Sequence, residues 1–420
     1  MLIFFFLFQI TQHKLTLPFT TGITNEIDFL YESKMENQMK AYIKIGSPEI
    51  SIPLIIKLRQ YPLQITSINS NIRKKIPLFD EEKSSSYKKL SSTPIKLIYD
   101  NDYKEGFISV DSFSYGTYGK EESKINKIEF FLIKNLTKNI SGILGLNILD
   151  DKINCCGFLK QLFNQKKIEE SIFYFNLSNN NNSDYKGELI IGEYPHSIDS
   201  KNYPEKNYKT IISSSSKNFE IFFENFTFGD YVYFEKETIA ELKIESDLFF
   251  GSFHFGNFLN NKYFNHYKDC EKIIVLKNYF SFVCLSENAK NNFKDINFKL
   301  KDHKFSFYLT KEDVFKEYNG KYYLLIYFNE LNTYNWSFGK NFFIKYMLVF
   351  NPEKKEIGFY SNNDAFSFLW IFIILLFVSI GYLILLLMLN MLKKPKENSS
   401  NELKDDYDYI VYKYYNHDNV

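Results

Sequence analysis

One stretch near the C-terminus divides this chain of 420 residues into parts with different surroundings. Between Asp364 and Lys393 there is no charged residue, and residues 366–391 read FSFLWIFIILLFVSIGYLILLLMLNM. A segment this long and apolar is typical of one transmembrane helix with some tilt. Trp370 lies near one end, where an indole suits the membrane interface, and lysines follow the other end. By the positive-inside rule, residues 392–420 are predicted to be a cytosolic tail, in a type I single-pass topology.

The N-terminus carries a second, shorter apolar run, from Leu2 to Ile10. The run is too short to span a bilayer and is typical of the core of a signal peptide, so residues 1–18 are predicted to be a leader. No basic residue precedes the run and no clear small-residue cleavage motif follows it, so the cleavage position stays open. A buried strand is the alternative. Leader and span together predict the secretory pathway, with residence at the cell surface or in an endolysosomal membrane.

Motifs for N-glycosylation are consistent with this topology. Some of the Asn-X-Ser/Thr motifs are expected to carry glycan, because they fall on the predicted extracytosolic side. They begin at Asn135, Asn139, Asn176, Asn181, Asn225 and Asn335. Asn398 also fits the motif, but it falls in the predicted cytosolic tail and is not expected to be modified.

The four cysteines form two pairs in the sequence. Cys270 and Cys284 would close a loop of about 15 residues, and a bridge there would stabilise the fold by roughly 3 kcal/mol in an oxidising lumen. Cys155 and Cys156 are adjacent, and they could form a vicinal disulfide, stay reduced or pair between chains. Neither pair has zinc-site spacing with histidine, so no metal and no other cofactor is expected. The net charge of +1 argues against a nucleic-acid partner.

The region between the two apolar segments has the pattern of a β protein. Residues 40–360 consist mainly of short apolar runs with period-two alternation, such as 41–45 (AYIKI), separated by Asn, Ser, Lys and Gly clusters. This pattern predicts half-buried strands. Residues 158–167 (FLKQLFNQKK) are one short helix candidate. Because the length exceeds what one core usually serves, two mostly-β lobes are predicted, 40–200 and 201–362.

Several motifs follow one another in an informative order. Residues 41–48 read AYIKIGSP, 142–146 read GILGL and 187–193 read GELIIGE, while 336–351 read WSFGKNFFIKYMLVFN. Together they resemble the pepsin-like (eukaryotic) aspartic proteases, and the likeness runs from about residue 40 to 362. The resemblance implies a mostly-β, bilobal, double-β-barrel fold.

The resemblance also implies roles for single residues. Tyr99 falls where the family has the tyrosine of its flap, and Gly106 and Asp111 follow it. Cys270 and Cys284 fall where the family often has a disulfide in its second lobe. A flap over a groove between the lobes implies a peptide or protein ligand.

The family reaction needs two facing carboxylates that share one proton. The ionised carboxylate takes a proton from water, and the protonated one polarises the peptide carbonyl. In the family, each carboxylate belongs to an Asp-Thr-Gly or Asp-Ser-Gly turn, whose glycine permits the turn and whose hydroxyl holds the carboxylates in place.

This chain departs from that pattern at both turns. Alignment of the first half from Gly46 and Pro48 puts Lys57 at the expected aspartate, and alignment of the second half from Ala240 puts Lys243 there. The positions that follow each lysine are also replaced, by Leu58 and Arg59 and by Ile244 and Glu245. An ammonium group has no acceptor lone pair, so the catalytic positions are predicted to be degenerate.

Three functions are therefore compatible with the sequence. The first is a membrane-anchored, proteolytically inactive homologue that binds a peptide or protein in its interlobe cleft. The second is an active aspartic endopeptidase, although Asp247 lies past its turn and Asp100 lies in the flap. The third is a structural surface glycoprotein, in which Lys57 and Lys243 are ordinary surface lysines rather than an anion site.

The predicted tail carries a short sorting-like motif. Residues 407–410, with Tyr407 and Ile410 at the ends, fit Tyr-X-X-apolar and resemble an endocytic or lysosomal sorting signal. A disordered, tyrosine-rich tail is the alternative.

Overall fold

The computed structural model divides the chain into two compact units, Met1–Ser361 and Asn362–Val420. It describes residues 14–21, 39–71, 76–99, 102–115, 123–138, 140–147, 156–178, 186–215, 218–233, 238–244, 246, 248–276, 278–301, 303, 305–331, 335–360 and 364–392. The first unit is mostly β, as predicted.

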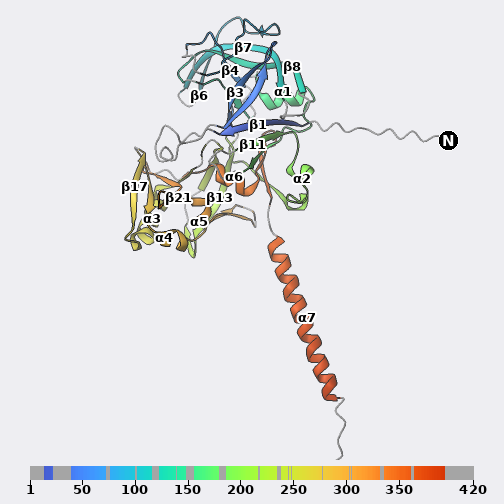
Figure 1. Cartoon of the computed structure of the whole chain (residues 1–420), viewed down its shortest axis with the longest axis vertical. Helices are drawn as coiled ribbons and strands as arrows, with labels where there is room; N and C mark the ends of the chain where they lie inside the picture. Colours follow the sequence, from blue (N-terminus) through green and yellow to red (C-terminus); the bar gives the residue numbers. More distant parts are fainter. Residues whose placement is uncertain are drawn as a thin grey trace, which may run out of the picture. The chain divides into compact units, whose positions relative to one another are not determined.

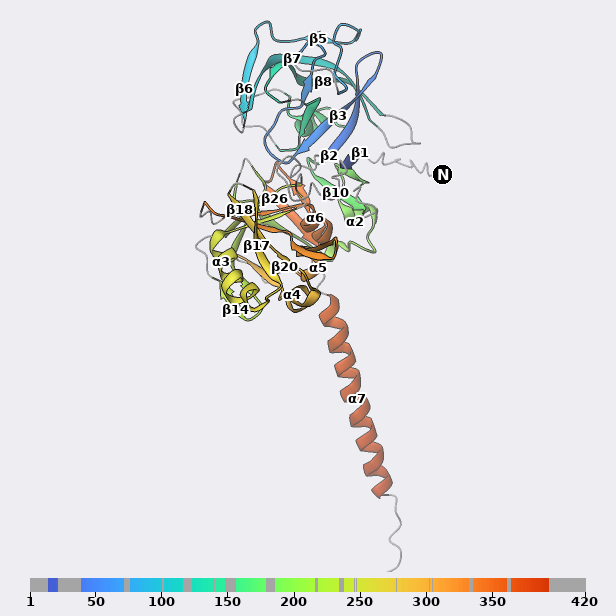
Figure 2. The same cartoon turned by 60° about the vertical axis from the view of Figure 1, so that its left-hand side comes forward.

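Two sheets build the described part of the first unit (Figures 1 and 2). The first sheet contains β1 Leu15–Thr21, β2 Met39–Ile45, β3 Ile50–Lys57, β4 Gln64–Thr66, β5 Lys88–Lys89, β6 Ile95–Tyr99, β7 Asp102–Tyr115, β8 Ser123–Leu136, β9 Gly142–Gly145, β10 Phe173–Ser178, β11 Lys186–Ile191, β12 Tyr208–Ile212, β25 Val349–Asn351 and β26 Glu356–Tyr360. The second contains β13 Glu220–Phe228, β14 Tyr231–Tyr233, β15 Thr238–Leu242, β16 Phe249–Gly251, β17 Cys270–Leu276, β18 Tyr279–Cys284, β19 Ile296–Leu300, β20 Ser306–Leu309, β21 Phe315–Tyr318, β22 Lys321–Leu324, β23 Ile326–Asn329 and β24 Trp336–Phe338.

Short helices cover the sheets. They are α1 Phe158–Asn164, α2 Pro195–Ile198, α3 Phe253–Lys262, α4 Glu287–Asn292, α5 Lys311–Val314 and α6 Lys340–Tyr346, with single 3-10 turns η3 Glu205–Asn207 and η4 Phe264–His266. The helix predicted for 158–167 is present as α1 but ends earlier, because the backbone of Lys166 is left-handed (φ 55°).

The alternation of buried apolar and more exposed side chains explains why these segments are strands. In β2, Met39, Ala41, Ile43 and Ile45 are fully buried, while the side chains between them reach the other face. The same alternation recurs in β19, so a strand of either sheet can bury one face in the aromatic-rich core.

Strand β1 overlaps the end of the predicted leader. It pairs with β11 and β2, and its Leu15, Leu17 and Phe19 are buried. A cleavage after residue 18 would remove more than half of this strand. Residues 1–13 lie outside the described residues, so a leader that ends before β1 is the form compatible with the sheet.

The first sheet takes strands from both halves of the sequence. β10 and β11 belong to the first half, whereas β12, β25 and β26 come after residue 200. β10 pairs with β25, with Phe173 opposite Phe350. The predicted boundary at residues 200/201 therefore separates the two halves along the chain, but the sheet runs across it.

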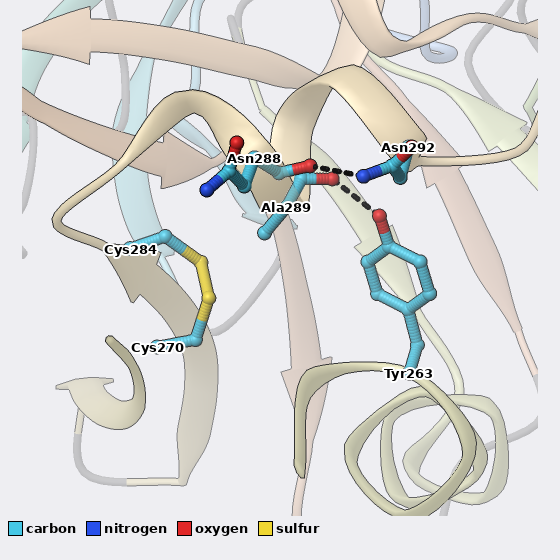
Figure 3. Close-up of a disulfide and its surroundings, with 6 residues drawn as sticks. All are labelled: Tyr263, Cys270, Cys284, Asn288, Ala289 and Asn292. Carbon is cyan, nitrogen blue, oxygen red and sulfur yellow. Dashed lines mark hydrogen bonds between the residues drawn. A yellow bond between two sulfur atoms is a disulfide. The ribbon is translucent and has the colours of Figure 1, made fainter. Parts of the chain in front are cut away.

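The predicted disulfide between Cys270 and Cys284 is present (Figure 3). The two residues lie opposite each other in β17 and β18. Nearby, the hydroxyl of Tyr263 donates to the carbonyl of Ala289 in α4, which ties α3 to that helix. The disulfide thus closes one end of a hairpin in the second sheet.

The second unit contains helix α7, Asp364–Leu392, drawn in orange-red in Figure 1. Its side chains are described from Leu375 to Leu389, and large apolar ones among them are exposed. Within the described residues, no helix is both long enough and apolar enough to qualify as a membrane span. The predicted span at 366–391 stays a prediction.

Candidate active site

The same strand arrangement occurs in each half of the first unit. In the first half, β9 lies between a parallel neighbour, β3, and an antiparallel neighbour, β4. In the second half, β24 lies between a parallel neighbour, β15, and an antiparallel neighbour, β16. The chain leaves β3 and β15 at corresponding points, so the residues there are structurally equivalent.

Lys57 and Lys243 stand at these two points. Lys57 is the last residue of β3, opposite Gly145 of β9, and its carbonyl accepts from the N–H of Leu146 at 3.0 Å. Lys243 follows β15, and its N–H donates to the carbonyl of Phe338 at 2.9 Å. Both lysines therefore stand at corresponding positions of the two halves.

An ion cluster joins the two turns. The guanidinium of Arg59 donates to Oε1 of Glu241 from Nε at 3.1 Å and from Nη2 at 2.7 Å. Nζ of Lys243 lies 3.2 Å from Oε2 of the same carboxylate. Both carboxylate oxygens are thus held by cations, one from each half of the chain. We call Lys57, Arg59, Glu241 and Lys243 the interlobe floor.

Apolar side chains replace the hydroxyls expected beside the catalytic residues. Leu58 is 2% exposed and Ile244 is fully buried. Neither side chain can donate a hydrogen bond, so neither could hold a carboxylate in place. Glu245, Asp247 and Asp100 lie outside the described residues.

The described residues of the interlobe floor do not form a proton-sharing acid pair. A general acid/base pair at acidic pH needs two carboxylates close enough to push their pKa values apart. The described floor has one carboxylate, Glu241, and it is ion-paired on both oxygens. Among the described residues there is also no group of three or more His, Cys, Asp or Glu side chains that could hold a metal ion.

The predicted flap is a hairpin of β6 and β7. Tyr99, the last residue of β6, lies opposite Asp102 in the register. In the middle of the hairpin, opposite Leu97, Lys104 is 1% exposed and its Nζ lies 5.6 Å from the ring centroid of Tyr61. The N–H of Tyr61 donates to the carbonyl of Arg59 at 2.9 Å, so the hairpin approaches the segment that carries the floor.

A carboxylate supports the segment that precedes the flap. Glu81 accepts from the hydroxyl of Ser67 at 2.7 Å and from the ammonium of Lys134. Burial alone would raise the pKa of Glu81, but the hydrogen bonds from Lys134 and Ser67 outweigh it, and the pKa is lowered. Glu81 is therefore held as a carboxylate that ties this segment to β8.

An apolar wall borders the floor on the side of the second half. Nζ of Lys243 lies 5.9 Å from the ring centroid of Phe250. The ring of Phe250 meets that of Tyr279 edge to face, with centroids 5.4 Å apart, and both pack with Ile273 on a small buried cluster. All three side chains are only partly buried.

A hollow elsewhere on the first half is separate from this site. It measures about 800 Å³ and lies between α1 and strands β5, β7 and β8. Lys88, Lys127 and Lys160 on its lining are exposed, and Cys156 is buried in its wall. Cys155 lies outside the described residues, so the pairing of the adjacent cysteines stays open.

The remaining predicted site residues are the glycosylation asparagines and the two residues of the sorting-like motif, and only some of them lie within the described residues. Asn135, Asn176 and Asn335 are exposed and Asn225 is partly buried, which leaves these motifs accessible to some degree. Residues outside the described part of the chain are Asn139, Asn181, Tyr407 and Ile410.

Glu241 and Lys104 were not identified from the sequence. Glu241 is 182 residues from its partner Arg59, so no local pattern connects them. One signal could have drawn attention to Arg59: it is one of only two arginines in the chain, the other being Arg73. In a chain that otherwise uses lysine, an arginine is suited to a planar pairing with carboxylate that lysine does not reproduce.

The chain matches the model of a known protein family. The family model described as eukaryotic aspartyl protease covers residues 40–362, more than half of the chain. The matched region contains both sheets except β1, and it contains the interlobe floor.

Proposed function

Because the chain belongs to the eukaryotic aspartyl protease family, we propose that it is a membrane-anchored homologue of these enzymes that lacks proteolytic activity and binds a peptide or protein in its interlobe cleft. The observation that carries this proposal is the ion cluster of Arg59, Glu241 and Lys243, which lies where the family reaction needs two carboxylates. An ammonium or guanidinium has no lone pair with which to accept a proton from the attacking water, and both oxygens of the Glu241 carboxylate are occupied by cations.

An assay for peptide hydrolysis tests the loss of activity. The full-length protein in detergent is incubated at acidic pH with a complex peptide mixture, with and without pepstatin, and the products are identified by mass spectrometry. An active pepsin-like enzyme in the same detergent is the control. We expect no new peptide termini. Cleavage that pepstatin inhibits would instead support the alternative of an active endopeptidase, with a carboxylate pair outside the described residues.

The side chains at the floor support binding over a purely structural role. The floor presents partly exposed cations, and the wall of Phe250, Tyr279 and Ile273 beside it is only partly buried. A few charged groups next to apolar side chains are typical of a ligand site.

Sequence features support the placement of the protein in a membrane of the secretory pathway. Residues 366–391 are free of charge and fall within α7, and lysines follow them. Exposed glycosylation motifs at Asn135, Asn176 and Asn335 fit an extracytosolic first unit.

The membrane-extracted protein tests leader, glycans and anchor together. We expect release by detergent but not by alkaline carbonate, a smaller mass after glycosidase treatment, and a mature N-terminus that retains all of β1. Release by carbonate would contradict the anchor, and an N-terminus beyond Leu15 would contradict the role of β1.

A further inference from the structure

We infer that the interlobe floor selects acidic peptide segments, in which carboxylates alternate with apolar side chains. This inference rests on the proposed function, because it names the ligand class of the same cleft. It departs from what a proteolytic site would select, since a carboxylate here meets cations rather than a pair of acids.

The charge of the floor is the first argument. In the described part of the floor, Arg59 and Lys243 both contact Glu241, and Lys57 stands at the corresponding turn of the first half. The side chains of Arg59 and Lys243 are 30% and 31% exposed, so a ligand can reach them. An ammonium group carries three N–H donors, and the contact of Lys243 with Glu241 uses one of them.

A hydroxyl beside the floor is the second argument. Ser337 in β24 lies opposite Glu241 of β15, so the two side chains share a face of the sheet. Ser337 is 4% exposed, and its Oγ has no hydrogen-bond partner among the described residues. A buried polar atom without a partner calls for an explanation, and a ligand group in the cleft would supply one.

The apolar wall is the third argument, and it determines the spacing of acidic and apolar side chains along the peptide. An extended peptide sends alternate side chains to opposite sides. Lys243 is close enough to Phe250 that a carboxylate on the floor and an apolar neighbour on the wall can belong to the same short segment. Aromatic and aliphatic residues interleaved with Glu or Asp meet both surfaces.

Two peptides that differ only in charge test the inference. The probes are acetyl-Glu-Phe-Glu-Phe-Glu-amide and the same peptide with Gln in place of each Glu, each carrying a fluorophore. Binding to the full-length protein in detergent is measured by anisotropy at low and at high salt. We expect the Glu peptide to bind about tenfold more tightly at low salt, and the preference to shrink at high salt because salt screens partly exposed charges.

Variants locate the preference on the floor. Lys243→Gln is expected to remove most of the preference for Glu, Lys243→Arg to retain it, and Lys299→Gln, which changes an exposed side chain of β19, to leave it unchanged. Equal binding of the two peptides by the wild-type protein, or binding of neither, would overturn the inference without any variant. A preference that survives in Lys243→Gln would overturn it as well.

The same samples separate this inference from the proposed function. Each peptide is recovered after the measurement and examined by mass spectrometry. Cleavage of either peptide would contradict the loss of activity, whatever the binding preference. Intact peptides that bind equally would leave the loss of activity standing and remove only the acidic ligand.

Discussion

At the scale of single residues, Glu241 holds the floor together. Its carboxylate accepts from Arg59 on one oxygen and meets Lys243 on the other, so it neutralises cations from both halves of the chain. Without it, the charges of Arg59 and Lys243 would repel each other. The charge at this position is therefore more important than the identity of either cation.

A double-mutant cycle of Arg59 and Glu241 measures how much this ion pair stabilises the fold. Glu241→Gln is expected to lower the free energy of unfolding more than Arg59→Met does, because only the first change leaves the cations without their carboxylate. The coupling energy of the pair is expected to be about 1–2 kcal/mol, above the usual range for exposed pairs. The measurement is urea unfolding of the detergent-solubilised protein.

The exposed pair Lys299–Glu224 is the matched control. Its N–O distance is 2.9 Å, close to that of Arg59–Glu241, but its side chains are 51% and 49% exposed. The same cycle on this pair is expected to give less than about 0.5 kcal/mol. Equal coupling energies for the two pairs would show that the Arg59–Glu241 pair stabilises the fold no more than an exposed surface ion pair does.

At the scale of elements, the partly buried carboxylate of Glu81 ties the segment between β4 and β5 to β8. The side chain of Glu81 is 9% exposed and binds Ser67 and Lys134. The pKa of Glu81 is lower in the folded state than in the unfolded state. Its ionised carboxylate therefore stabilises the fold fully above the unfolded pKa of about 4.3, and this stabilisation is lost as the pH falls through the folded pKa. The flap hairpin follows this segment directly.

The pH dependence of Glu81→Gln tests this contribution. At neutral pH the variant is expected to be less stable than the wild type by about 1–3 kcal/mol, since Lys134 loses its partner. At a pH below the folded pKa of Glu81 the difference is expected to disappear. Thermal unfolding across this range is the measurement, and Glu224→Gln is the control. A difference that does not change with pH would contradict the assignment.

Most strands and one helix were predictable because their signals are local. Period-two alternation predicted β2, and the apolar positions of Phe158 and its neighbours predicted α1. The end of α1 was placed too late, since nothing in the letters marks the left-handed backbone at Lys166. The predicted leader, residues 1–18, overlaps the start of β1, but the apolar run Leu2–Ile10 on which that prediction rests lies outside the described residues.

At the scale of the whole molecule, long-range pairing limits what sequence alone can predict. The strand pair β10–β25 joins residues near 173 and 350, and the ion pair of Arg59 with Glu241 crosses the two halves. The lysines at the two turns could be placed by motif order, because each follows a strand with a recognisable start. The role of Glu241 could not be predicted in this way, because its contact with Arg59 forms only when the two halves of the chain pack together.

The central claim is that the cleft has a cation–carboxylate cluster where the family has two proton-sharing acids. A crystal structure of the detergent-solubilised protein at acidic pH, examined at the centre of the cleft, tests it most directly. The account predicts the guanidinium of Arg59 within hydrogen-bond distance of Glu241, with the ammonium of Lys243 on the other oxygen. Two carboxyl groups within hydrogen-bond distance of each other at that point would contradict it.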